Sequence, residues 1–238
     1  MSPIIHRANE RGISELGWLS SRFSFSFAEY HNRERMGFGT LRVINDDRIN
    51  AGAGFGMHPH RDMEIITIVT KGALEHRDSE GNHGIIHAGE IQYMSAGTGI
   101  YHSEHATDAE DTELFQIWIH PNKQGYTPRY EQRDFRSLTA TKGWHTLVSG
   151  DGRDHSIQIR QSAQISIASL KNGEKLETPK MEKDRGLLLL VIEGMITIDG
   201  NVLNRRDEIQ ITHIGIHTIE ALDNTQVLLF DVALKIRS

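Results

Sequence analysis

The chain has 238 residues, of which 32 are acidic and 26 are basic, so its formal net charge is −6, and it contains no cysteine. No run of five or more lysines and arginines occurs, which argues against a phosphate-binding stripe and against direct binding to nucleic acid. Without cysteine there is no disulfide, no thiol nucleophile and no thiolate metal site. Any metal must therefore be bound by histidine, carboxylate or water.

The apolar segments are too short for a membrane span. The longest, LLLLVI at residues 187–192, falls far below the roughly 20 residues that a membrane helix needs. The first 18 residues have no apolar signal core. We therefore expect a cytoplasmic protein that does not contact membranes, and we expect it to be a monomer.

Turn signals divide the chain into short strands rich in isoleucine, valine and leucine, so we predict an all-β fold. Residues 64–94 predict four strands, with corners at Gly72 and Gly89 and a turn at residues 79–82. Residues 186–211 repeat this plan, with Gly194 in the place of Gly72. Such duplication predicts two closed barrels or jelly rolls, because closure removes free sheet edges. We place the first domain at residues 1–135 and the second at 136–238, joined through the polar stretch 122–144.

Two pairs of possible metal ligands lie in the first domain. His58 and His60 in GFGMHPHRDMEI are two residues apart and therefore face the same side of a strand. His102 and Glu104 have the same spacing. Either pair alone is expected by chance in a chain with 14 histidines, but their order within one predicted barrel directs three imidazoles and one carboxylate into one cavity.

Other polar residues near these pairs are given weaker roles. Glu64 shares the face of His58 by period two, so it either orients an imidazole or only makes hydrogen bonds at the barrel mouth. Five further histidines are expected on the surface or in hydrogen bonds, facing away from the ligands: His76, His83, His87, His105 and His120. Five side chains are expected to fill the core rather than line a pocket: Phe55, Met57, Tyr93, Met94 and Tyr101.

The second barrel has no matching ligand set. When its repeat is aligned with the first, the HxH positions fall near Lys180 and Glu182, and the HxE positions fall near Glu220 and Leu222. His213 and His217 lie nearby without partners two residues away, so we expect them to be structural. The second barrel is therefore predicted to support the first without binding metal.

The spacing of Gly52, His58, His60, Glu64 and Gly72 looks like the first cupin motif, and Gly89 with His102 looks like an expanded second motif. The strings HPHRDMEI and SAGTGIYHSE are more specific. They resemble the pirin family, and in particular the short bacterial pirin-like proteins assigned quercetin 2,3-dioxygenase activity. The likeness extends over the whole chain through GWLSSRFSFSFAEY and MGFGTLRVINDD. It implies a bicupin fold with two tandem jelly-roll domains and one metal, bound by His58, His60, His102 and Glu104.

Three imidazoles and one carboxylate suit several divalent ions. We expect one such ion, with iron foremost and copper, nickel, manganese, cobalt or zinc as alternatives. An octahedral ion would keep two open positions for a chelating substrate, or for a substrate and dioxygen. Its net charge with these ligands is +1, which a flavonolate would neutralise. Glu104 is also the catalytic candidate, because it can accept the substrate hydroxyl proton.

The resemblance implies a metal-dependent dioxygenase that opens the heterocyclic ring of a flavonol such as quercetin and releases carbon monoxide. One alternative is a metal-dependent redox-sensing module, or co-regulator, that acts through a regulatory protein partner, with the same four residues as structural ligands. A cupin that only buffers metal is a third interpretation. It predicts neither turnover nor a partner.

Overall fold

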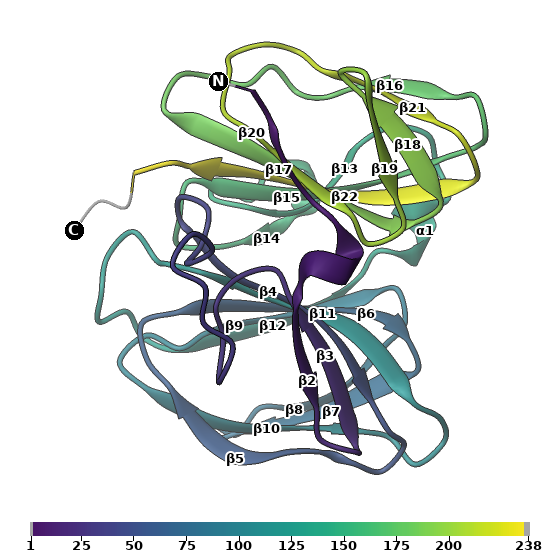
Figure 1. The fold of residues 1–238 in the computed structure, drawn as a ribbon. Helices are drawn as coiled ribbons and strands as arrows, with labels where there is room; N and C mark the ends of the chain where they lie inside the picture. The colour runs from purple at the N-terminus through teal and green to yellow at the C-terminus, as the bar shows by residue number, and fades with distance from the viewer. Residues whose placement is uncertain (1, 236–238) are drawn as a thin grey trace.

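The computed structural model describes residues 2–235, and strands dominate it (Figure 1). Two β domains are stacked on each other (Figure 1). Three short helical segments interrupt the strands: η1 (Ala8–Glu10), α1 (Arg136–Thr139) and η2 (Arg153–His155). Among residues 2–235 no helix has the length and apolar character that crossing a membrane requires.

The first domain is built from eleven strands in two sheets. Their bounds are β2 (Gly12–Glu15), β3 (Leu19–Phe23), β4 (Leu41–Ile49), β5 (Gly54–His60), β6 (Glu64–Lys71), β7 (Ala73–Asp78), β8 (His83–His87), β9 (Glu90–Ser95), β10 (Ile100–Ala106), β11 (Thr112–Ile119) and β12 (Arg129–Asp134). The larger sheet has the order β12-β9-β6-β11-β4-β3-β2, and the smaller one has the order β5-β10-β7-β8. The four strands predicted within residues 64–94 are confirmed as β6 to β9.

The second domain repeats this arrangement. Its strands are β1 (Ile4–His6), β13 (His145–Ser149), β14 (Ile157–Gln158), β15 (Ala163–Leu170), β16 (Lys175–Glu177), β17 (Arg185–Glu193), β18 (Met195–Ile198), β19 (Asn201–Asn204), β20 (Glu208–Ile211), β21 (Thr218–Ala221) and β22 (Thr225–Ala233). The larger sheet is β1-β20-β17-β22-β15-β13-β14. The smaller sheet, β16-β21-β18-β19, matches the smaller sheet of the first domain strand for strand. The predicted all-β bicupin fold is confirmed.

Glycine is required at the two corners at which the two repeats of the sequence are aligned. Gly72 and Gly194 adopt φ of 72° and 83°, in the left-handed region that favours glycine. A Cβ atom would lie 2.7 Å from the Asp111 carbonyl oxygen at Gly72 and 2.4 Å from the Asn224 carbonyl oxygen at Gly194. The same backbone crowding therefore fixes the same turn in both domains.

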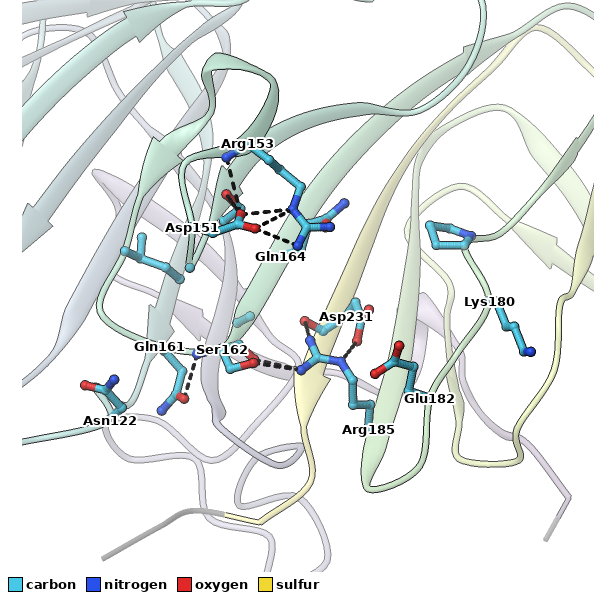
Figure 2. Close-up of a pocket in the computed structure, with 15 residues that line it drawn as sticks. Asn122, Asp151, Arg153, Gln161, Ser162, Gln164, Lys180, Glu182, Arg185 and Asp231 are labelled. Carbon is cyan, nitrogen blue, oxygen red and sulfur yellow. Dashed lines mark hydrogen bonds and ion pairs between the residues drawn. The ribbon is translucent and has the colours of Figure 1, made fainter.

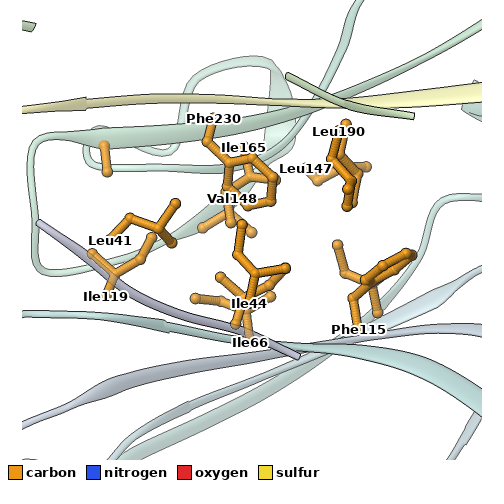
Figure 3. Packing of buried hydrophobic residues seen from close by; sticks show 14 of the residues in the cluster. Leu41, Ile44, Ile66, Phe115, Ile119, Leu147, Val148, Ile165, Leu190 and Phe230 are labelled. Carbon is orange, nitrogen blue, oxygen red and sulfur yellow. The ribbon is translucent and has the colours of Figure 1, made fainter. Parts of the chain in front are cut away.

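A shared apolar core holds the domains together (Figure 3). Side chains along the strands of the larger sheets point alternately to the two faces of the sheet. One face packs into the barrel of its own domain, and the other packs against the neighbouring domain. Leu41, Ile44 and Phe115 of the first domain are fully buried in this layer against Leu190 and Phe230 of the second. The interface is thus continuous with the cores, as expected for domains that keep one relative position.

The chain start crosses between the domains, which the sequence analysis did not anticipate. β1 pairs with β20 of the second domain, and the chain then passes through η1 into β2 of the first (Figure 1). Behind this crossing, the Glu208 carboxylate accepts hydrogen bonds from Arg35 at 2.5 Å, from the Ser24 hydroxyl at 2.7 Å and from Arg11 at 3.4 Å. Buried charges thus tie the crossing segment to the second domain.

The expected linker is also more ordered than predicted. Residues 129–134 form β12, which pairs with β9 at the edge of the larger first sheet, and α1 follows directly. The division between residues 135 and 136 stays a prediction.

Candidate metal centre

The strands with the two ligand pairs are neighbours. β10 pairs antiparallel with β5, which places His102 directly opposite His58 and Ile100 opposite His60. The ring centroids of His58, His60 and His102 lie 4.4 to 4.9 Å apart, and one ligand atom from each lies within 4.8 Å of the others. Pro59 is exposed between the half-buried histidines, as the period of two predicted. The structure therefore brings the three imidazoles together.

Hydrogen bonds leave the Nε2 atoms of two rings free for an ion. His58 Nδ1 lies 2.8 Å from the Gly56 carbonyl oxygen, so Nδ1 carries the proton and Nε2 has the lone pair. His102 is 1% exposed, and its Nε2 has no hydrogen-bond partner among the described residues. A buried ring nitrogen without a partner is costly. A metal ion satisfies it, and the donor set therefore fits a divalent metal.

The rings of His60 and His102 are neutral, which is the ligating form. Burial, followed by the neighbouring charges of His102 and His58, lowers the pKa of His60 to about 4. Burial, followed by His58 and His76, lowers the pKa of His102 to about 3. Protons therefore do not compete with a metal at neutral pH.

His76 orients His102, and the expectation that it faces away from the ligands is wrong. It is fully buried on β7, next to β10. Its Nε2 donates to Asp78 Oδ2 at 3.1 Å, so its Nδ1 is an acceptor. His102 Nδ1, at 3.5 Å, donates to it, which keeps His102 Nε2 unprotonated. Tyr130 stacks on the other side of the His76 ring, with centroids 4.8 Å apart.

Glu104 falls into a second group of potential ligands, with His76 and His102. Its ligand atom falls within 4.8 Å of those of His76 and His102, whereas His58 and His60 form their own group with His102. Both carboxylate oxygens are held by amides: Gln92 donates to Oε1 and Gln116 to Oε2, each at 3.0 Å. The four predicted ligands thus form two overlapping groups that share His102, and their joint ligation stays a prediction.

Glu64 does not orient an imidazole. Its carboxylate is completely buried and accepts hydrogen bonds from the Tyr93 and Ser95 hydroxyls at 2.5 and 2.6 Å. It also accepts the backbone N–H of Arg160 from the second domain at 2.9 Å. Glu64 therefore makes hydrogen bonds alone, as the alternative expected, but it does so at the contact with the second domain and not at the barrel mouth.

Aromatic side chains line the approach to the histidines. Trp118 contacts His60 edge-on with centroids 5.0 Å apart, and Phe55 lies 6.2 Å from His58. Met57 and Tyr101 are more than half exposed, so their expected core role is wrong, whereas Tyr93 and Met94 are fully buried as expected. Apolar surface is therefore available beside the candidate centre.

A separate polar groove of about 540 Å³ lies on the second domain (Figure 2). It includes none of the clustered histidines. Two of its arginines are already neutralised, because Arg153 pairs with Asp151 at 2.7 Å and Arg185 pairs with Asp231 at 2.6 Å. It offers no comparable set of free donors.

The second barrel differs from the first at the ligand positions, but the sequence alignment placed them wrongly. Ala106 pairs with Leu74, two residues after Gly72, and Ala221 pairs with Ile196, two residues after Gly194. Counting back along β10 and β21 makes His217 equivalent to His102, and Ile219 equivalent to Glu104. The predicted positions, Glu220 and Leu222, were three residues too far along, because the second repeat is shorter before β21.

Fold and site together define a bicupin with a histidine-rich candidate metal centre in its first barrel. The chain belongs to the pirin family. The pirin profile matches residues 6–119, and a profile described as the quercetinase C-terminal cupin domain matches residues 146–232.

A quercetin 2,3-dioxygenase of Escherichia coli K12 is 44% identical over 96% of this chain and 97% of its own length. A pirin-like protein of Caulobacter vibrioides is 41% identical over 93% of this chain and 96% of its own. The crystal structure of the E. coli pirin YhhW in complex with nickel(II) is 43% identical, with a TM-score of 0.93, and the match covers 98% of this chain and 99% of that one. The chain is a quercetin 2,3-dioxygenase-like cupin enzyme.

Proposed function

We propose that the chain is a metal-dependent dioxygenase that opens the heterocyclic ring of a flavonol such as quercetin with release of carbon monoxide. The observation that carries the proposal is the convergence of three imidazoles, one of them with a buried Nε2 that has no partner among residues 2–235. The names of the relatives supply the substrate class.

The proposed ligands are His58, His60, His102 and Glu104. Glu104 joins the three histidines if its carboxylate turns from Gln116 toward His102, while Gln92 still donates to the other oxygen. When bound, the ion supplies Lewis acidity toward the oxygen atoms of the substrate and a route for dioxygen to react. YhhW makes nickel one candidate beside iron, and the donor set also accepts copper, manganese, cobalt and zinc.

The side chains around the centre have separate tasks. Glu104 accepts the proton of the flavonol hydroxyl, which makes the substrate an anion that matches the charge of the site. The His76 and Asp78 chain holds His102 in its ligating tautomer. Trp118 and Phe55 offer apolar surface to the flat rings of a flavonol.

The test uses the full chain, stripped of metal and loaded separately with each candidate ion. Quercetin is added under oxygen, and loss of flavonol absorbance and formation of carbon monoxide are followed together. We expect turnover above that of the free ion. His58→Ala is expected to lose metal, whereas Glu104→Gln is expected to keep part of it and to lose turnover, because an amide ligates weakly and accepts no proton.

His83→Ala is the matched control, since His83 is an exposed histidine of the same domain whose side chain hydrogen-bonds to Glu75. It should keep both metal and turnover. The proposal fails if no ion gives turnover above the free ion and His102→Ala equals the wild type. A stoichiometric protein partner retained from lysate in only one redox state, together with no turnover, would instead favour the sensor.

A further inference from the structure

Three potential ligands lie together at one end of the second barrel, outside the centre described above. Asp199 is in the turn between β18 and β19, while His213 and His217 both lie in the loop between β20 and β21. One ligand atom from each lies within 4.8 Å of the other two. The cluster was missed in the sequence because its members are neither two residues apart nor on one strand.

The distances within the cluster suit a small ion. Asp199 Oδ2 lies 2.6 Å from His217 Nδ1 and 3.9 Å from His213 Nε2, and the two rings are 4.7 Å apart and nearly perpendicular. Two donors on one ion with bonds of about 2.1 Å are separated by roughly 3 to 4 Å. The longer distance already fits, and the shorter one opens by rotation of the Asp199 carboxylate, which is 33% exposed on its turn.

The histidines keep polar atoms without partners. His217 has a side chain that is 4% exposed, and its Nε2 makes no hydrogen bond within the described part of the chain. His213 Nδ1 is likewise buried and unpaired among these residues. Such atoms cost free energy. They are the ring nitrogens opposite the two that face Asp199, so an ion satisfies them when the rings turn about their Cβ–Cγ bonds.

The backbone of His217 is fixed independently of its ring. Its N–H donates to the Thr178 hydroxyl at 3.0 Å, and its carbonyl accepts the Thr178 N–H at 2.8 Å. His217 also occupies the strand position equivalent to His102. The barrel therefore presents this imidazole at its mouth. The positions equivalent to His76 and Glu104 are occupied by Ile198 and Ile219, so the two loops supply the remaining donors.

We propose that Asp199, His213 and His217 form a second metal site that binds a divalent ion of the borderline class, such as zinc, nickel or cobalt. Two imidazoles and one carboxylate select these ions, since calcium and magnesium prefer oxygen ligands alone. His213 is 40% exposed, so the ion is reached from solvent and keeps open positions for water or a small ligand. This site is independent of the proposed dioxygenase activity.

The experiment counts bound ions. The full chain is stripped with a chelator, exchanged into metal-free buffer and titrated with Zn²⁺ by calorimetry, and in parallel with Co²⁺ by its visible absorption. We expect two equivalents in the wild type and one in His213→Ala. His213 is half exposed, so this variant should fold normally, which thermal unfolding verifies. His155→Ala, an exposed histidine of the same domain outside the cluster, should keep two.

The double variant His58→Ala/His60→Ala isolates the new site and should keep one equivalent, which Asp199→Asn in the same background should remove or weaken at least tenfold. The proposal is overturned if the double variant binds no Zn²⁺ or Co²⁺, or if His213→Ala still binds as many equivalents as the wild type. Either result would leave the cluster as an Asp199–His217 hydrogen bond.

Discussion

Replacing Asp78 with asparagine should weaken metal binding although Asp78 is not a proposed ligand. Asp78 Oδ1 accepts the backbone N–H groups of Glu80 at 3.0 Å and Asn82 at 2.9 Å. In Asp78→Asn these two donors keep the amide oxygen in that place. The amide nitrogen must then occupy the position of Oδ2, 3.1 Å from His76 Nε2. Asn82, whose Nδ2 donates to Oδ2 at 2.9 Å in the wild type, must turn its amide so that its oxygen accepts there instead.

This exchange reverses the protonation of the next two rings. An amide N–H requires an acceptor, so His76 must carry its proton on Nδ1 instead of Nε2. His76 Nδ1, 3.5 Å from His102 Nδ1, then becomes the donor, and the proton of His102 moves to Nε2. That atom is the proposed ligand. Loss of such an outer partner typically costs 10- to 100-fold in metal affinity, which corresponds to about 1.4 to 2.7 kcal/mol.

Metal affinity is measured by competition between the protein and a chromophoric chelator for Zn²⁺ or Ni²⁺. Asp111→Asn is the control, because Asp111 also accepts a backbone N–H, from Ala51, and pairs with the exposed Arg48 outside the candidate centre. It should bind metal as the wild type does. An Asp78→Asn affinity within threefold of the wild type, with thermal stability unchanged, would refute the tautomer argument.

Local sequence rules predicted the hairpins and the two ligand strands well. Glycines with φ above +20° end strands at Gly72 and Gly194, and alternation places His58 and His60 on one face. Both signals depend only on neighbours along the chain. His76 and Asp78 are also two residues apart, so alternation places them on one face of a strand as well. That they lie beside His102 follows only from the pairing of β7 with β10, which the sequence does not show.

Predictions that extended periodicity across a loop failed. Glu64 was assigned the face of His58 by counting in steps of two, but the chain turns at Asp62, with φ of 47°, and β6 belongs to a different sheet from β5. Glu64 therefore faces the second domain. The alignment of the second barrel failed similarly, because equal loop lengths were assumed before β21. Pairing of β1 with β20, about 200 residues away, has no local signal at all.

Two further substitutions test the buried charges of the fold. Glu208→Gln leaves Arg11 and Arg35 without their carboxylate and should destabilise the chain by about 3 to 5 kcal/mol in denaturant unfolding; a loss no larger than that of the exposed control Glu220→Gln would contradict this. Asp47 is buried, and this burial raises its pKa from 3.8 to about 7. The folded chain therefore keeps a proton that the unfolded chain releases, and stability falls as the pH rises from about 4 to 7. Asp47→Asn should match the stability of the wild type near pH 4 and exceed it at pH 8 by up to about 4 kcal/mol. If the difference in stability between the variant and the wild type were the same at both pH values, Asp47 would be ionised in the folded chain.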